Sequence, residues 1–277
     1  MSATDPGALF QPTGGFFLIA GPCVLEDNDV ALRIAEELAE IARRQGIAII
    51  YKASFDKANR SSFGSPRGPG IERGLRMLER VRDASELPLL TDVHEAAQCA
   101  SVADVVDALQ IPAFLCRQTD LLEAAGSTGR PVNVKKGQWM APAEMSGATE
   151  KLRRAGAEGV AVTERGTFFG YGNLVVDMRS FAELREACDA PAVFDGTHSV
   201  QRPGRGAGVS GGDPRHTPAL VRSATAAGAD ALFLEVHPEP ATAPSDATNM
   251  LPLDRLEPLL ETVLALRAAI APAPVHA

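Results

Sequence analysis

The regular alternation of apolar runs with amphipathic helical stretches predicts a single-domain α/β fold, the (β/α)8 barrel. Eight strand-like runs follow one another along the 277-residue chain. Most are continuously apolar, which is typical of parallel strands that are buried on both faces. A barrel needs about 250 residues, so eight units within residues 15–270 fit this fold better than a doubly wound sheet, which has fewer strands.

The elements follow in order from the hydrophobic pattern. The predicted strands cover residues 16–23, 47–55, 87–93, 105–111, 131–137, 159–166, 190–197 and 231–240. Between them, apolar residues recur at the spacing of one helical face. The helices predicted on this basis cover residues 29–45, 70–85, 119–126, 143–156, 216–228 and 253–270. Gly46, Gly156 and Gly228 stand where three of these helices are expected to end.

The ends of the chain and the absence of a second domain complete the fold prediction. No change in composition marks a second domain. We expect residues 1–14 to form a loose N-terminal extension and residues 271–277 a frayed tail. The single GxGxxG match, at residues 206–211, lies inside a loop rather than after the first strand, which disfavours a dinucleotide-binding fold.

The composition limits the binding partners and the cellular compartment that we expect for this protein. The 35 acidic residues exceed the 27 basic ones, for a formal charge of −8, so we do not expect nucleic acid as a partner. No apolar run is long enough to cross a bilayer, so we expect no membrane partner. The four cysteines form no CxxC pair and are too few for a disulfide scaffold, which favours the cytoplasm. We interpret Cys99, Cys116 and Cys188 as structural.

Cationic side chains gather at the predicted carboxyl ends of the strands, where barrel enzymes carry their chemistry. The chain has 22 Arg but only five Lys, and four of these Lys lie at strand ends: Lys52, Lys57, Lys135 and Lys136. Their convergence predicts an anionic, phosphorylated ligand, although some of these charges could instead pair with acidic residues at the rim.

A second group of strand-end residues has the composition of a metal site. Cys23 follows the first strand, His198 the seventh, Glu235 ends the eighth, and Asp246 lies in the loop beyond it. Strands 7, 8 and 1 are neighbours in a closed barrel, so one thiolate, one imidazole and two carboxylates could bind a divalent ion such as zinc, iron or manganese. Taken singly, a buried Cys or a hydrogen-bonded His is a commoner finding. The Gly-rich segment 202–216 is either a mobile lid over this mouth or a solvated loop.

Several long motifs occur in order and give the chain a family resemblance. They include IAGPCVLE, YKASFDKANRSS, RGPG, TDVHE, NVKKGQWMAP, FDGTHSVQ and LEVHPEPATAPSDATNMLPL. From about residue 15 to residue 262 the chain resembles the 3-deoxy-D-manno-octulosonate 8-phosphate synthases, also called 2-dehydro-3-deoxyphosphooctonate aldolases. The resemblance implies a tetrameric (β/α)8 enzyme that condenses phosphoenolpyruvate with arabinose 5-phosphate for lipopolysaccharide core synthesis.

The resemblance also implies roles for individual residues. Cys at position 23 and the late SDA motif are similar to the metal-dependent branch, and so imply Cys23, His198, Glu235 and Asp246 as metal ligands. The implied phosphoenolpyruvate contacts are Lys52, Lys57, Gln110, Lys136 and Arg165. Those implied for the pentose phosphate are Asn59, Arg60 and Ser61, with Arg117 from a neighbouring subunit and with Asp92 and His94 on the same rim. Lys136 is expected to stabilise the reacting anions, and His198 and Asp246 are candidates for handling the proton of water.

Three other functions remain open at this point. A 3-deoxy-7-phosphoheptulonate synthase performs the same chemistry on erythrose 4-phosphate, but a KPRT-type motif would then stand where this chain has KANRSS. A Schiff-base aldolase would use one of the rim lysines. A non-catalytic sugar-phosphate sensor is also possible, although a full ligand set beside two anion-binding clusters argues against it.

Overall fold

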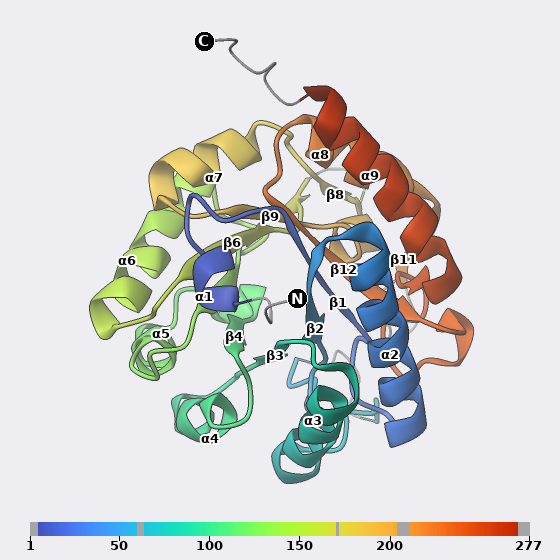
Figure 1. The fold of residues 1–277 in the computed structure, drawn as a ribbon. Coiled ribbons are helices and arrows are strands. Elements are labelled where there is room, and N and C mark those ends of the chain that lie inside the picture. The colour runs from blue at the N-terminus through green and yellow to red at the C-terminus, as the bar shows by residue number, and fades with distance from the viewer. Residues whose placement is uncertain (1–4, 60–63, 170–171, 204–210, 271–277) are drawn as a thin grey trace, which may run out of the picture.

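A closed barrel of eight parallel strands forms the centre of the molecule, with the helices outside it (Figure 1). The computed structural model describes residues 5–59, 64–169, 172–203 and 211–270. The barrel strands are β1 (Phe17–Gly21), β2 (Ala48–Lys52), β3 (Leu89–Asp92), β4 (Ala108–Ile111), β5 (Val132–Lys135), β6 (Val160–Glu164), β9 (Ala192–Asp195) and β12 (Ala231–His237). Each pairs with the next, and β12 pairs with β1 to close the ring. The predicted fold class and all eight predicted strands are confirmed.

The helices that cover the barrel agree with the predicted helices and add two more. They are α2 (Asn28–Gln45), α3 (Ile71–Ser85), α4 (Cys99–Ala103), α5 (Thr119–Gly126), α6 (Ser146–Ala155), α7 (Ser180–Cys188), α8 (Thr217–Ala226) and α9 (Leu256–Ile270). Sequence reasoning missed α4, which has only five residues, and α7, in which apolar and polar positions are weakly segregated between the two helix faces.

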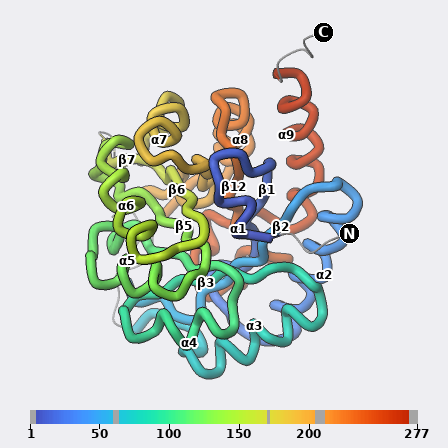
Figure 2. The backbone as a smooth tube through the Cα atoms, turned by 60° about the vertical axis from the view of Figure 1, so that its left-hand side comes forward, coloured from blue at the N-terminus to red at the C-terminus, as the bar shows by residue number. Residues whose placement is uncertain are grey.

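Two apolar layers hold the barrel together. Nearly all strand residues are buried, as expected for strands with one side facing the barrel interior and the other the helices. A large cluster packs between strands and helices, and a smaller one, with Phe17, Ile50 and Phe233 among its members, fills the interior. The ring of helices is completed where α9 lies beside α2 (Figure 2), and there Glu257 accepts hydrogen bonds from Arg44 and Gln45.

The N-terminal segment is not loose over its described residues, which corrects that expectation. Pro6–Leu9 form the short helix α1, capped by Asp5. Phe10 is 1% exposed and packs in the interior cluster, with its ring centroid 5.5 Å from that of Phe17. An apolar side chain placed just before the first strand closes the amino end of the barrel. The predicted tail, 271–277, lies outside the described residues.

Five short strands lie at the carboxyl end of the barrel, outside the ring of eight, among the residues that the structure describes. The hairpin β7 (Thr167–Phe168) with β8 (Leu174–Val175) follows β6, and the ribbon β10 (Gln201–Arg202) with β11 (Gly211–Gly212) follows β9. Strand β13 (Leu251–Pro252) extends the sheet beside β12. The centre of the predicted lid, residues 204–210, lies outside the described residues. Among the helices described, none is long and apolar enough to span a membrane.

Candidate active site

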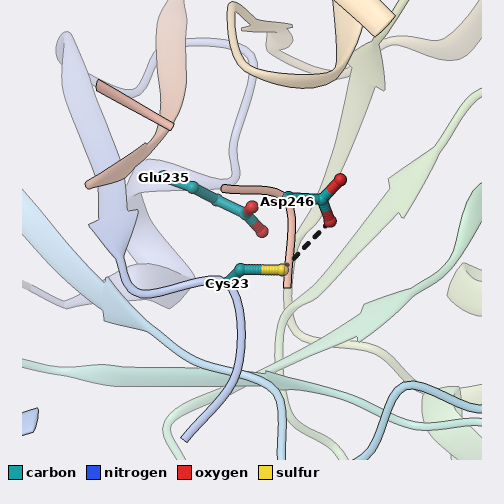
Figure 3. Close-up of side chains that lie close together, drawn as sticks. All are labelled: Cys23, Glu235 and Asp246. Carbon is teal, nitrogen blue, oxygen red and sulfur yellow. Dashed lines mark hydrogen bonds between the residues drawn. The ribbon is translucent and has the colours of Figure 1, made fainter. Parts of the chain in front are cut away.

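Three of the four predicted metal ligands converge at the carboxyl end of the barrel (Figure 3). One donor atom from each of Cys23, Glu235 and Asp246 lies within 4.8 Å of the others. Register explains the convergence, because Gly21 on β1 is paired with Glu235 on β12 and Cys23 follows two residues later. Gly21 has φ +154°, and a Cβ there would lie 2.1 Å from the carbonyl oxygen of Lys52, so only glycine allows this close approach of β1 to β2.

His198 stands at the edge of this cluster with one nitrogen directed toward it. Its Nε2 lies 3.8 Å from Oε2 of Glu235, while its Nδ1 lies 2.8 Å from Oδ2 of Asp195. The Asp195 carboxylate also accepts hydrogen bonds from the backbone N–H groups of Thr197 and His198. A carboxylate on Nδ1 fixes the imidazole tautomer and leaves Nε2 as a ligand, as in many metal sites.

The donors of the cluster fit a divalent cation. Oε2 of Glu235 is buried and has no hydrogen-bond partner among the described residues, a costly arrangement for a carboxylate unless a cation compensates it. Burial, together with the negative charge of Glu235, raises the pKa of the Cys23 thiol well above its usual value. Burial opposes ionisation of Asp246 as well, but His198, Lys57 and the Cys23 hydrogen bond hold its pKa below the usual range. Mixed sulfur and oxygen donors suit zinc, iron or manganese without selecting one.

A buried cationic cluster adjoins these ligands. The Nζ atoms of Lys52 and Lys57 each lie 2.9 Å from Oγ of Ser54, and that hydroxyl donates to Asp92. Lys52 Nζ is also 3.5 Å from Oε1 of Glu235, so the two clusters touch. Burial would lower the pKa of Lys57, but the surrounding negative charges, among them Glu235 and Asp92, raise it overall.

The two adjacent lysines after β5 point in different directions. Lys135 lies inside the barrel mouth, where it is paired with Asp195 and its Nζ is 3.4 Å from the centroid of the Phe233 ring. Burial lowers its pKa. Lys136 is fully buried and does not share the Asp195 and Phe233 contacts of Lys135. Its ammonium contacts the carbonyl oxygens of Gly137 and Met140, Oγ1 of Thr167 and Oε2 of Glu164.

The expected contact of Lys136 with the substrate anions does not fit this placement, in which protein groups surround its ammonium. Successive side chains of a strand point to opposite sides, so only one of two neighbouring lysines can face the mouth, and the structure turns Lys135 that way. Lys136 instead holds the loop after β5 against β7. The apolar character of the run could not reveal which of the two faced inward.

Arg165 follows β6 and is 5% exposed. Its Nη2 donates to Oε1 of Gln201 at 2.7 Å, and its Nη1 is buried without a partner among the described residues. Burial lowers its pKa, while nearby carboxylates, Asp195 first among them, oppose the shift. An unpartnered guanidinium nitrogen is suited to bind an anion.

Asp92 and Gln110 belong to a hydrogen-bonded ladder across the barrel. Gln110 donates to Asp92, Asn133 donates to Gln110 at 2.9 Å, and Thr163 donates to Asn133 at 2.7 Å. The positive charges of Lys52 and Lys57 overcome the effect of burial and keep the pKa of Asp92 low. His94 follows on the same rim, with a pKa lowered by burial.

Two of the remaining predicted substrate residues can be placed in the structure. Asn59 and Arg117 are exposed, and Arg60 and Ser61 lie outside the described residues. Sequence reasoning did not assign roles to Ser54, Asp195 and Gln201, although each lies within a quoted motif. Gln201 has only distant partners, and Ser54 and Asp195 each join near neighbours to one distant residue, Asp92 and Lys135, so spacing alone gave no signal for them.

Fold and site together are those of a barrel enzyme, with a metal-capable cluster beside a cationic cluster. A family model described as the DAHP synthetase I family matches residues 13–271. The chain is 56% identical over 250 residues to a 2-dehydro-3-deoxyphosphooctonate aldolase of Nitratidesulfovibrio vulgaris. These aligned residues cover 90% of this chain and 91% of that protein. The chain is 54% identical to a protein of the same name from Magnetococcus marinus, and the alignment covers 90% of this chain and 86% of that protein. It is also 54% identical to a protein of the same name from Synechococcus sp., with 92% of this chain and 89% of that protein covered.

The chain therefore belongs to the DAHP synthetase I family, within which it groups with the 2-dehydro-3-deoxyphosphooctonate aldolases. The family resemblance stated from the motifs is confirmed, and the chain is an enzyme of the aldol-condensing transferase type.

Proposed function

We propose that this chain condenses phosphoenolpyruvate with D-arabinose 5-phosphate and water to give 3-deoxy-D-manno-octulosonate 8-phosphate and inorganic phosphate, for lipopolysaccharide core synthesis. The observation that carries the proposal is the contact between two clusters: Lys52, from the anion-binding set, lies 3.5 Å from Glu235, from the metal-capable set. Such an arrangement can hold a phosphorylated enol next to an activated aldehyde.

The first step joins the two substrates. The C2=C3 π electrons of phosphoenolpyruvate form a bond from C3 to the aldehyde carbon of arabinose 5-phosphate. The C=O π bond of the aldehyde breaks, its oxygen becomes an alkoxide, and positive charge develops at C2. Lys52, Lys57, Lys135 and Arg165 would hold the phosphate and carboxylate of phosphoenolpyruvate in register, which lowers the barrier by orientation and by charge stabilisation. We assign Lys135 the contact first expected of Lys136, because its ammonium lies in the mouth.

The second step releases phosphate. Water adds to C2, loses a proton and gives a hemiketal phosphate, which expels inorganic phosphate to leave the ketone. Asp246, whose carboxylate keeps lone pairs beyond the one that would hold an ion, is the group that can accept this proton and pass it to the alkoxide formed in the first step. His198, the other candidate, has Nδ1 on Asp195 and Nε2 directed at the cluster, so it is left the role of a ligand. A divalent ion held by Cys23, His198, Glu235 and Asp246 would supply a Lewis acid that polarises the aldehyde oxygen. Asn59, Arg60 and Ser61 are the proposed contacts of the pentose phosphate.

An exposed aromatic surface supports a homotetramer. Phe114 and Trp139 stack with ring centroids 6.0 Å apart, and Phe168, whose N–H bonds to Gln138, continues the surface beside Val175. All four of these apolar residues are more than two-fifths exposed. Contiguous exposed apolar side chains mark association surfaces, and Arg117, three residues from Phe114, would then reach a neighbour's site. Trp139→Asp should dissociate the assembly, as measured by light scattering.

A cytoplasmic location fits the same proposal. All four cysteines are free and buried, which suits a reducing compartment. Both proposed substrates are small, soluble phosphorylated metabolites, and no nucleic acid or membrane partner enters the chemistry.

The experiment compares two acceptors. We expect phosphate release from phosphoenolpyruvate with arabinose 5-phosphate, and far slower release with erythrose 4-phosphate; the reverse preference would reject the acceptor assignment. Borohydride added during turnover should trap no covalent adduct, because no imine forms on a lysine. An adduct would instead support the Schiff-base aldolase.

A further inference from the structure

Gln201 lies between the anion-binding cations and the metal-capable cluster. It begins β10, three residues after His198. Its side-chain carbonyl accepts a hydrogen bond from Nη2 of Arg165 at 2.7 Å, and its NH2 group donates to Oδ1 of Asp246 at 3.0 Å. One neutral side chain therefore connects a proposed phosphoenolpyruvate contact directly to a proposed metal ligand.

The orientation of the amide is determined by its partners. A guanidinium only donates hydrogen bonds and a carboxylate only accepts them. A flipped amide would place NH2 against Arg165 and oxygen against Asp246, and both contacts would be repulsive. Among side chains of this length, only an amide offers an acceptor to one charge and a donor to the other.

Both partners are groups whose position matters for binding. The Asp246 backbone has φ +50°, a left-handed conformation that is uncommon outside glycine, and its Oδ2 contacts Cys23 Sγ at 3.1 Å. Figure 3 shows the other oxygen of Asp246, the one that Gln201 contacts, pointing away from Cys23. Arg165 keeps Nη1 buried and unpartnered among the described residues, so this nitrogen is the one left for a ligand.

We infer that Gln201 is a positioning residue that couples anion binding at Arg165 to metal binding at Asp246. The inference rests on the proposed function, since it takes phosphoenolpyruvate as the anion and a divalent ion at the cluster. An anion that draws Arg165 into place also orients the Gln201 amide, and the amide in turn holds Asp246 in its ligating rotamer. Linkage makes the effect reciprocal, so each ligand tightens the other by the same factor.

A second connection runs in parallel through Asp195, which contacts both Lys135 and His198. Substitution of Gln201 leaves that connection intact. We therefore expect the coupling to fall rather than vanish when Gln201 is changed.

The test measures the coupling directly. The Kd of Zn²⁺ is determined by competition with a chromophoric chelator, with and without saturating phosphoenolpyruvate and with no sugar phosphate present. The ratio of the two values is the coupling factor. In the unaltered protein we expect a factor of about ten or more, within the usual range of roughly 5 to 150. In Gln201→Met, which keeps side-chain length but has no amide, the factor should fall about fivefold.

Two further variants sharpen the comparison. Gln201→Glu can still pair with Arg165 but opposes the Asp246 carboxylate, so its Zn²⁺ affinity without phosphoenolpyruvate should fall about tenfold. Arg202→Gln is the matched control. It alters the next residue of β10, whose side chain pairs with Asp213 instead, and should keep the coupling factor of the unaltered protein.

The outcomes separate this inference from the proposed function. A coupling factor in Gln201→Met within twofold of the unaltered protein overturns the inference, as does a factor of one in the unaltered protein. A fivefold fall in Gln201→Met but not in Arg202→Gln supports it. Turnover of phosphoenolpyruvate with arabinose 5-phosphate by the unaltered protein is scored separately, and only its absence counts against the proposed function. Should Gln201→Met fail to fold, a coupling factor in folded Gln201→Glu within twofold of that of the unaltered protein would overturn the inference, because this variant has lost the donor to Asp246.

Discussion

The thiol of Cys23 lies 3.1 Å from Oδ2 of Asp246, although 223 positions separate the two residues in the chain. Closure of the barrel by β1 and β12 makes this contact possible, because the two strands leave the ring side by side. Two groups that would otherwise be unfavourable when buried thus face one another next to an unpartnered carboxylate oxygen of Glu235.

Replacing Cys23 with Ser should reduce metal affinity and turnover together. Loss of a supporting residue around a metal typically costs 10- to 100-fold in affinity, so removal of a ligand should cost at least about 100-fold. Metal content after dialysis and phosphate release are the two measurements. Cys99→Ser is the control, since that thiol lies in helix α4, outside the cluster. Full turnover by metal-stripped Cys23→Ser would contradict the assignment.

Replacing Asp195 with Asn should lower Zn²⁺ affinity about 10- to 100-fold, because His198 loses the carboxylate that fixes its tautomer. Asp230→Asn is a matched control: that carboxylate accepts the backbone N–H of Ala192 at the other end of β9, and it pairs with Arg185. The control should change stability but not metal affinity. Equal metal affinities in both variants would argue against a role for Asp195.

Lys135 and Lys136 should respond differently to replacement by Met. Lys135→Met should raise the KM for phosphoenolpyruvate, since an anion contact is lost from the mouth. Lys136→Met should mainly lower thermal stability, because it strips Glu164 of its buried counter-charge, a change that typically costs about 3–5 kcal/mol. Steady-state kinetics and thermal unfolding of both variants measure the split. A larger KM effect in Lys136→Met would reverse the assignment.

The contact between α2 and α9 predicts a pH-dependent contribution to stability. Hydrogen bonds from Arg44 and then Gln45 lower the pKa of Glu257 from 4.5 to about 2. A carboxyl group with a lowered pKa in the folded state stabilises it above pH 4.5, and this contribution is lost as pH falls toward 2. Denaturant unfolding of Glu257→Gln should show a lower stability at pH 7 and a smaller loss between pH 4.5 and 2. Parallel pH profiles for the two proteins would disprove the contribution.

The sequence predicts the barrel well because burial on both faces leaves a long apolar signature in each strand. All eight strands were found in this way, as were the long helices such as α2 and α3. Helix α4 was missed because it spans too few turns, and α7 because its apolar residues do not gather clearly on one face. The role of Phe10 in closing the barrel was not predicted, because a single apolar residue before a strand forms no hydrophobic pattern.

The sequence predicted which residues come together at the strand ends. It did not predict the direction in which individual side chains point. Cys23, Glu235 and Asp246 come together as expected from the order of the strands. The direction of Lys135 relative to Lys136 depends on the pleat at one position of β5, which the sequence pattern does not specify. Ser54 and Gln201 matter through Asp92 and Asp246, partners that only the folded chain brings near.

Metal removal and restoration during turnover tests the central claim most directly. Phosphate release from phosphoenolpyruvate and arabinose 5-phosphate is measured for the untreated protein, after EDTA treatment and dialysis, and after adding back zinc, iron or manganese singly. We expect release to fall to a few per cent or less and to recover with at least one metal. Undiminished release from protein shown to be metal-free would contradict a catalytic ion at Cys23, His198, Glu235 and Asp246.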